Sequence, residues 1–225
     1  SGVLNSYKAI WPNKNILSLP ARYINENKYK NYNMTKKYDI LLYGSRISKN
    51  NIQNHISDQN YKTKWEMHNN KTLSVEYIFY PLRVRLESLL LANSHKYNLK
   101  IIPNACIFDG PVANEGLSQL INESWLTIST CSRADIAFAK YFEIAGSYSG
   151  ILGNIPSDYK DVYESRMIEV TEWMSDDEIL SIIDNALSDK ERLQNMINML
   201  GDYTHQHYNL EASVRDMDNL FKQII

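Results

Sequence analysis

Two short segments of the sequence have the residue types that bind phosphate. Gly44-Ser45 directly follows the apolar run 38–43, and Arg83 falls in the first turn of a helix expected to begin at Pro81. Free main-chain N–H groups in a glycine turn and at a helix start attract an anion, and a guanidinium adds a bidentate contact. The alternative for Arg83 is an ordinary solvated residue on its helix. The GxGxxG and GxxxxGK[ST] motifs follow none of the predicted strands, so simple NAD-binding and NTPase functions lose their main support.

The paired acids and histidines near the C-terminus lack the spacing of a metal site. Asp216 and Asp218 imitate a DxD motif, but two residues apart on a helix their carboxylates face different ways. His205 and His207 have the same separation and no set of further ligands. We therefore expect no metal and no other cofactor, with the two Asp on the surface and the histidines in packing or capping roles.

The composition is that of an ordinary globular protein. The chain has 225 residues, 44% hydrophobic and 22% charged, with a formal net charge of -2. Because basic and acidic residues nearly balance, the chain has no overall excess of positive charge, so a nucleic-acid partner is not expected. Apolar runs such as 89–92 are far too short to span a bilayer, and Cys106 and Cys131 form neither a disulfide framework nor a CxxC site. We expect a soluble, cytoplasmic protein, and its many Asn, Lys, Ile and Tyr residues favour an AT-rich viral or bacterial genome.

The elements that must position these residues alternate between strand and helix. Compact apolar runs predict strands at 38–43, 99–103, 125–130, 151–155 and 167–170. Apolar residues at helical spacing predict helices at 81–95, 114–124, around 138–145, at 175–187 behind a capping box, and from 190 to the C-terminus. This alternation predicts a Rossmann-like, doubly wound α/β domain with a mostly parallel sheet and helices on both faces. Ligands bind such sheets at the carboxyl ends of the strands, which places Gly44 to Arg46, the Pro103 loop, Thr130 to Ser132 and the start of the Phe142 helix around one crevice.

The domain organisation follows from where this pattern begins. Residues 1–37 are too few to form a domain, so we interpret them as a hinge or linker from a missing or truncated N-terminal domain. The Rossmann-like domain is expected at 38–225. Within it, the polar stretch 47–76 shows no sustained period and is expected to be an irregular insertion.

The segment 135–150 is the most informative part of the chain. Its residues Lys140-Tyr-Phe-Glu143-Ile-Ala, with the small residues and Gly-Ile-Leu-Gly-Asn that follow, resemble the "[R/K]-x-F-E-x-x-A-x-G-x-x-x-L" signature of group 1-like GT-B glycosyltransferases. That signature lies in their C-terminal, donor-binding domain. Weaker similarities extend the resemblance over 38–221: the first strand with its glycine loop, Tyr80-Pro-Leu-Arg83, and the segment 205–208. These enzymes transfer a sugar from a nucleotide-sugar to an acceptor.

The resemblance implies a role for several residues. Glu143 would accept hydrogen bonds from the donor's ribose, and Lys140 would face the diphosphate. Asp135, eight residues before Glu143, would contact the transferred sugar. A carboxylate is a bidentate acceptor suited to a cis-diol, and a cation near the β-phosphate stabilises the charge that develops as the nucleoside diphosphate leaves. The alternative for Glu143 is a helix-capping carboxylate.

The resemblance also implies the partners of the chain. They are a nucleotide-sugar, a glycan, lipid or protein acceptor, and an N-terminal acceptor domain of the same protein. The catalytic base of inverting members usually comes from that other domain, so no catalytic residue is assigned and donor binding without efficient transfer is expected of this chain alone. The alternative function is a non-catalytic Rossmann-like module that binds a nucleotide or a partner protein.

Overall fold

Five parallel strands form one sheet at the centre of the molecule. The computed structural model describes residues 23–44, 80–102, 115–132, 135 and 137–222, so Ser45, the Pro103 loop and the expected insertion at 47–76 lie outside the described residues. The strands are β1 (Tyr38–Leu42), β2 (Leu99–Ile101), β3 (Ser124–Ile128), β4 (Gly150–Gly153) and β5 (Ile168–Glu169). Their order is β2-β1-β3-β4-β5, and all four neighbouring pairs are parallel. This is a common doubly wound order, and it confirms the predicted Rossmann-like α/β fold.

The strands are buried on both faces, which explains why they are continuous apolar runs. In β1, Ile40 and Leu42 contribute to one hydrophobic cluster, whereas Leu41 belongs to the cluster on the opposite face. Successive side chains of a strand point to opposite faces, so both faces of the sheet must be covered. The predicted strand positions agree with the observed ones to within a few residues.

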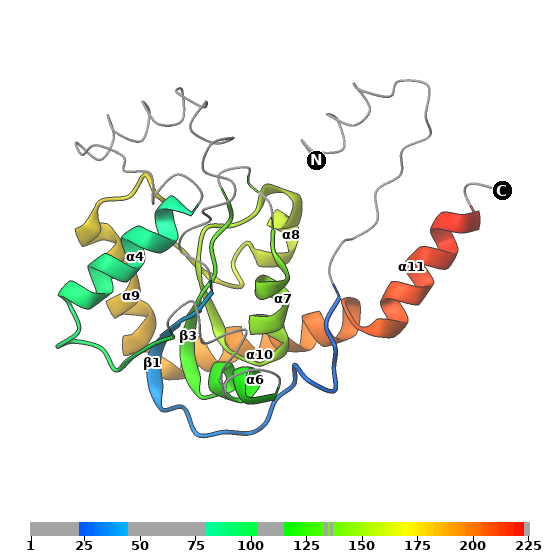
Figure 1. Cartoon of the computed structure of the whole chain (residues 1–225), viewed down its shortest axis with the longest axis horizontal. Helices are drawn as coiled ribbons and strands as arrows, with labels where there is room; N and C mark the ends of the chain where they lie inside the picture. Colours follow the sequence, from blue (N-terminus) through cyan, green and yellow to red (C-terminus); the bar gives the residue numbers. More distant parts are fainter. Residues whose placement is uncertain (1–22, 45–79, 103–114, 133–134, 136, 223–225) are drawn as a thin grey trace.

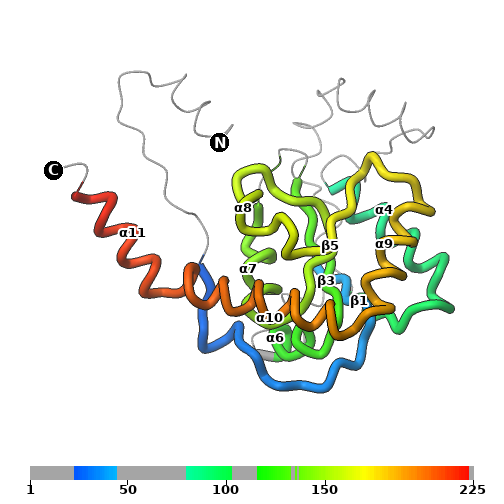
Figure 2. The backbone as a smooth tube through the Cα atoms, turned by 180° about the vertical axis from the view of Figure 1, so that it is seen from behind, coloured from blue at the N-terminus to red at the C-terminus, as the bar shows by residue number. Residues whose placement is uncertain are grey.

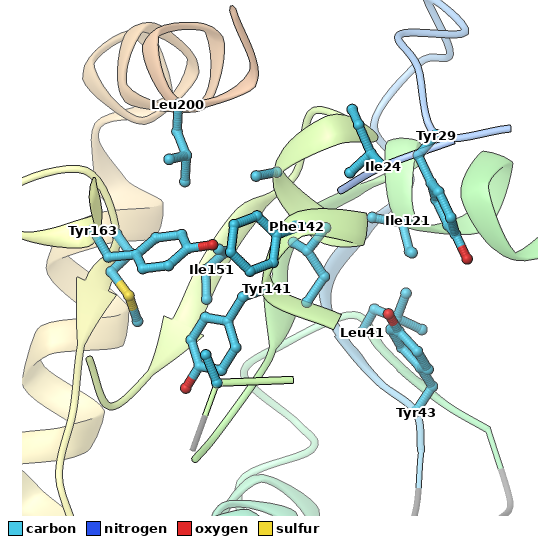
Figure 3. Close-up of a cluster of buried hydrophobic side chains, with 14 of the residues drawn as sticks. Ile24, Tyr29, Leu41, Tyr43, Ile121, Tyr141, Phe142, Ile151, Tyr163 and Leu200 are labelled. Atoms are coloured by element: carbon cyan, nitrogen blue, oxygen red, sulfur yellow. The ribbon is translucent and has the colours of Figure 1, made fainter. Parts of the chain in front are cut away.

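Helices cover both faces of the sheet, as Figures 1 and 2 show. Residues of α4 (Pro81–Ala92) and α9 (Asp176–Ser188) pack in one cluster, and those of α6 (Glu115–Asn122), α7 (Ala139–Gly146) and α8 (Lys160–Tyr163) pack in the other. A 3-10 turn, Ser157–Tyr159, precedes α8, and neither element was expected. Figure 3 shows Tyr141 and Phe142 of α7 packed beside Tyr163, which anchors α7 against the core.

The C-terminal part is two helices where the sequence predicted one. They are α10 (Lys190–His207) and α11 (Leu210–Lys222), and the break between them is at Asn209. The Asn209 side chain donates to the carbonyl of His205 and accepts from the N–H of Ala212. An Asn side chain that bonds to the main chain in this way competes with the helix ladder, which is why one helix ends and another begins here. Among the described helices, none combines the length and apolar character that crossing a bilayer requires.

Residues 23–37, the described part of the expected linker, pack against the domain. The side chains of Ile24 and Tyr29 are buried in the core, and the N–H of Ile24 donates to the carbonyl of Tyr208. The Lys36 ammonium donates to the carbonyls of Ser124 and Tyr148. Burial lowers the pKa of Lys36 to about 7.

Candidate functional site

The strand order changes direction between β1 and β3, which makes the carboxyl ends of these two strands the expected position of a ligand. The chain adds β2 on one side of β1 and then returns to add β3 on the other side. At such a topological switch point the connections diverge in opposite directions and leave room for a ligand. Gly44 follows β1 and Thr130 follows β3, so the predicted crevice residues lie at this point.

Gly44 holds a backbone conformation that favours glycine and leaves space for a cation. Its φ is +92°, a region that residues with a Cβ rarely adopt. A Cβ at this position would lie 2.6 Å from Nζ of Lys140 and 3.8 Å from Nη1 of Arg83. The two cationic side chains therefore meet beside the same glycine, although their residues are on different helices.

Lys140 is buried at the start of α7. Its side chain is 9% exposed, and its ammonium donates to the carbonyl of Tyr43. Nζ also lies 3.8 Å from the centroid of the Tyr43 ring. A carbonyl and an aromatic face both attract a cation, so Tyr43, the residue directly after β1, holds the ammonium next to Gly44.

Arg83 is buried at the start of α4, so the interpretation of Arg83 as a solvated surface residue is wrong. Its side chain is 4% exposed and Nη2 donates to the carbonyl of Thr130 at 3.2 Å. The guanidinium carbon lies 4.0 Å from the centroid of the Tyr80 ring. The position in the first turn was visible in the sequence, but the burial depends on β3, which lies beside β1.

The helices that carry these two cations begin without a capping side chain. The residues before α4 and α7 are Tyr80 and Phe138, and neither makes a side-chain hydrogen bond to its helix. By contrast, α9 has the predicted Ser175 capping box and α10 is capped by Asp189. Both uncapped helix starts lie at the carboxyl edge of the sheet, where the positive end of a helix dipole favours an anion.

Two hydroxyl groups at the end of β3 lack partners within the described part of the chain. They are Oγ of Ser129 and Oγ1 of Thr130, and both residues are fully buried. A buried hydroxyl without a hydrogen bond is costly, and such groups are rare in folded proteins. The sequence predicted a strand at 125–130 that ends in these two hydroxyl residues, and it placed Thr130 at the edge where a ligand is expected.

Glu143 lies on the second turn of α7, too far into the helix to cap its N-terminus. α7 begins at Ala139 and has no acidic residue in its first turn, which excludes the helix-cap alternative. The carboxylate is half-buried and faces two phenols. Burial chiefly raises the pKa of Tyr29 and of Tyr43, and the charge of Glu143 raises both further. Figure 3 shows these two tyrosines on the same flank of the core.

Asp135 is exposed in the loop between β3 and α7. Its φ is +55°, which is uncommon for a residue other than glycine. Both carboxylate oxygens accept from the N–H of Ser157 at 3.3 Å, so Asp135 connects this loop to the one after β4. Burial raises the pKa of the neighbouring Cys131 thiol to about 12, with a smaller contribution from the charge of Asp135. The thiol therefore stays protonated and is a poor nucleophile.

The remaining residues with ligand-like side chains have structural contacts. Nε2 of His205 lies 2.8 Å from the carbonyl of Gly146, Asp216 accepts from Tyr23, and Asp218 pairs with Lys222. Within the described residues, no group of three His, Cys, Asp or Glu side chains could hold a metal ion.

A cavity of about 410 Å³ lies away from the switch point, at the opposite end of the strands. It opens beside the start of β5, between the end of α9 and the start of α10. Its position does not coincide with the predicted site, and the segments 45–79 and 103–114, which follow β1 and β2 in the sequence, are outside the described residues. We therefore assign the candidate site from the switch point and its side chains.

The chain resembles solved glycosyltransferases in fold. No family model and no curated protein matches it. Sucrose-phosphate synthase from Thermosynechococcus elongatus matches with a TM-score of 0.56 at 10% identity, over 98% of this chain and 56% of that chain. The pneumococcal O-GlcNAc transferase GtfA in complex with UDP and GlcNAc matches with a TM-score of 0.56 at 12% identity, over 99% and 43%. A GtfA/B complex matches with a TM-score of 0.52 at 12% identity, over 99% and 43%.

The chain thus spans about half the length of the solved chains that it matches. At such low identity the likeness shows the fold alone, and this fold agrees with the GT-B type expected from the sequence.

Proposed function

We propose that this chain is the nucleotide-sugar-binding domain of a glycosyltransferase. The observation that carries the proposal is the convergence of Arg83 and Lys140 on Gly44 at the switch point between β1 and β3. Two buried cations so close together repel each other, and an anion placed between them would relieve that repulsion. The glycosyltransferase structures that share this fold add independent support.

The diphosphate of the donor would bind at Gly44 and Ser45. Arg83 and Lys140 would supply charge-assisted hydrogen bonds, and the uncapped starts of α4 and α7 would supply main-chain N–H groups. The same groups would stabilise the negative charge that the nucleoside diphosphate gains as it leaves the sugar. We propose that this binding needs no metal ion, because the side chains of Arg83 and Lys140 already supply two positive charges to the diphosphate.

The ribose would bind at Glu143. An ionised carboxylate has about four lone-pair sites, so beside the phenols of Tyr29 and Tyr43 it would still have the capacity to accept from a cis-diol. Asp135, on the same edge of the sheet, would contact the transferred sugar, and its αL backbone is the kind of strain that often accompanies a binding role.

Transfer would require parts beyond these residues. We propose that an acceptor-binding domain supplies the catalytic base and the site for a glycan, lipid or protein acceptor. Accordingly, the chain alone should bind nucleotide-sugars without transferring the sugar efficiently.

Calorimetry with UDP, GDP, ADP and CMP, each beside its nucleoside, tests the proposal. Lys140→Ala and Arg83→Ala should each weaken binding of the preferred diphosphate by about ten- to a hundredfold, because a charge-assisted hydrogen bond contributes about 1.5–3 kcal/mol. Binding of the nucleoside should change little. Lys160→Ala removes a cation whose side chain is 66% exposed on α8 and serves as the matched control.

Two results would contradict the proposal. If the folded parent chain binds none of the four nucleotides or their sugar derivatives, the non-catalytic alternative is favoured. If folded Lys140→Ala and Arg83→Ala bind the diphosphate like the parent, the phosphate site lies elsewhere. Circular dichroism of each variant establishes that it is folded, since both residues are buried.

A further inference from the structure

The cavity beside β5 has an apolar floor. It encloses about 410 Å³ between the start of β5, the end of α9 and the start of α10, which can be followed in Figure 2. Sites for small molecules have volumes of about 300–1,000 Å³. Leu193 is buried, whereas Ile182 and Met196 are only partly buried, so part of the apolar surface is open to a ligand. The whole apolar lining consists of Met167, Ile168, Ile182, Ala186, Leu193 and Met196.

The rim of the cavity has one negative and one positive side chain available to a ligand. Glu169 of β5 and Arg192 of α10 both line the cavity, and both are exposed. Within the described part of the chain, neither side chain forms an ion pair or a hydrogen bond. Asp189, the third charged residue of the lining, is the N-cap of α10, where its carboxylate accepts from the main-chain N–H of Arg192 at 3.0 Å. Glu169 and Arg192 therefore remain as the two charges that a ligand can meet.

The turn before β5 is strained at this rim. Ser165, which lines the cavity, has a φ of +65°, uncommon for a residue other than glycine. The guanidinium of Arg166 donates to the carbonyls of Asp161 and Val162 in α8, and these contacts hold the turn. Backbone strain of this kind clusters at binding sites. It is a second observation, independent of the charges, at the same cavity.

We propose that this cavity binds a free α-amino acid with an apolar side chain. The ammonium would pair with Glu169, the carboxylate would pair with Arg192, and the side chain would cover the apolar floor. An amine or a carboxylic acid alone would use only one of the two charges. Met167 and Met196 are unbranched and adapt to side chains of different shape, so leucine, methionine and phenylalanine are all suitable ligands.

A single amino acid fits this cavity better than an extended peptide. β5 is at the edge of the sheet, and a peptide strand can pair with such an edge. However, β5 has only two residues, so its edge offers few main-chain hydrogen bonds. The charges also favour a free amino acid, because its ammonium and carboxylate are attached to the same carbon atom and can meet both sides of one rim.

Amide NMR spectra of the full chain, titrated with L-leucine, test the proposal. The expected dissociation constant is on the order of 0.1–1 mM, because the ligand has few atoms and both charges of the rim are exposed. The largest shifts should occur at the amides of 165–169 and 182–196. Isocaproate lacks the ammonium of leucine and isoamylamine lacks its carboxylate, so each should bind about three- to fivefold more weakly.

Variants of the lining locate the site. Glu169→Gln should weaken leucine binding about three- to fivefold without weakening isocaproate binding, and Arg192→Gln should weaken leucine binding equally without weakening isoamylamine binding. Ala186→Phe fills the cavity and should abolish the leucine shifts. Glu191→Gln changes an exposed acid next to Arg192 but outside the lining, so this matched control should bind leucine like the parent. Circular dichroism establishes that each variant is folded.

Any of four results would overturn the proposal. The first is the absence of shifts at the cavity with about 20 mM leucine, methionine or phenylalanine. The second is binding of isocaproate or isoamylamine as tight as that of leucine. The third is unchanged leucine binding in folded Glu169→Gln and Arg192→Gln. The fourth is a shift of the cavity amides when the protein is diluted without ligand, because a second copy of the chain would then be the occupant.

Discussion

Replacing Gly44 with alanine tests whether Lys140 occupies the space beside this residue. At a φ of +92° a residue with a Cβ is strained, at a cost of about 1–2 kcal/mol. The new Cβ would lie 2.6 Å from Nζ of Lys140, so the ammonium, the movable end of this contact, must leave. Leaving breaks its hydrogen bond to the Tyr43 carbonyl, which contributes about 1.5–3 kcal/mol for a charged donor. Together the two effects should lower the free energy of unfolding by about 2.5–5 kcal/mol.

A double-mutant cycle separates the backbone strain from the displaced ammonium. In a Lys140→Ala background the contact is already gone, so Gly44→Ala should cost only the strain of about 1–2 kcal/mol. Urea denaturation of the four proteins, followed by circular dichroism, measures all four free energies of unfolding. Equal costs of Gly44→Ala in both backgrounds, within about 0.5 kcal/mol, would refute the placement of Lys140 beside Gly44.

Three further predictions test the ribose site, the metal independence and the titration of Lys36. Glu143→Gln keeps the shape of the side chain but loses its charge, so it should weaken binding of a ribonucleotide more than of its 2′-deoxy form; an unchanged ratio in calorimetry would remove the ribose assignment. Donor binding should be the same in excess EDTA and with added Mn²⁺, and loss of most of the affinity on chelation would contradict it. Burial lowers the pKa of Lys36 from 10.5 to about 7, so the unfolded chain binds more protons above pH 7. The free energy of unfolding should therefore rise between about pH 7 and pH 9, and urea titrations should find that Lys36→Met flattens this rise.

Much of the fold could be predicted because the local spacing of apolar residues indicates which side chains are buried. The apolar run of β1 predicts a strand covered on both faces, and Ile40 and Leu41 do point into opposite clusters. Ser175 and Glu178 form the capping box that their spacing indicates. The break at Asn209 was missed, because an Asn is common in helices and its effect depends on which main-chain groups its side chain reaches.

The candidate site could be predicted only in part. The glycine turn, the position of Arg83 at a helix start and the Lys140–Glu143 motif are local features, and each was visible in the sequence. The sequence contained no sign that Tyr29, from a segment interpreted as linker, lies beside Glu143. Nor did it indicate that Arg83 is buried, since a lone arginine on a helix is usually solvated.

The sequence by itself determined the residue types and the local elements of this protein, whereas the tertiary structure alone decided which of them meet. Lys140 bonds to the carbonyl of Tyr43, 97 positions earlier in the chain, and Arg83 bonds to that of Thr130, 47 positions later. Both contacts depend on β3 lying next to β1, which is a property of the strand order. Hydrophobic periodicity is set by neighbours within a few residues, so it specifies a strand or a helix but carries no information about the pairing of distant strands.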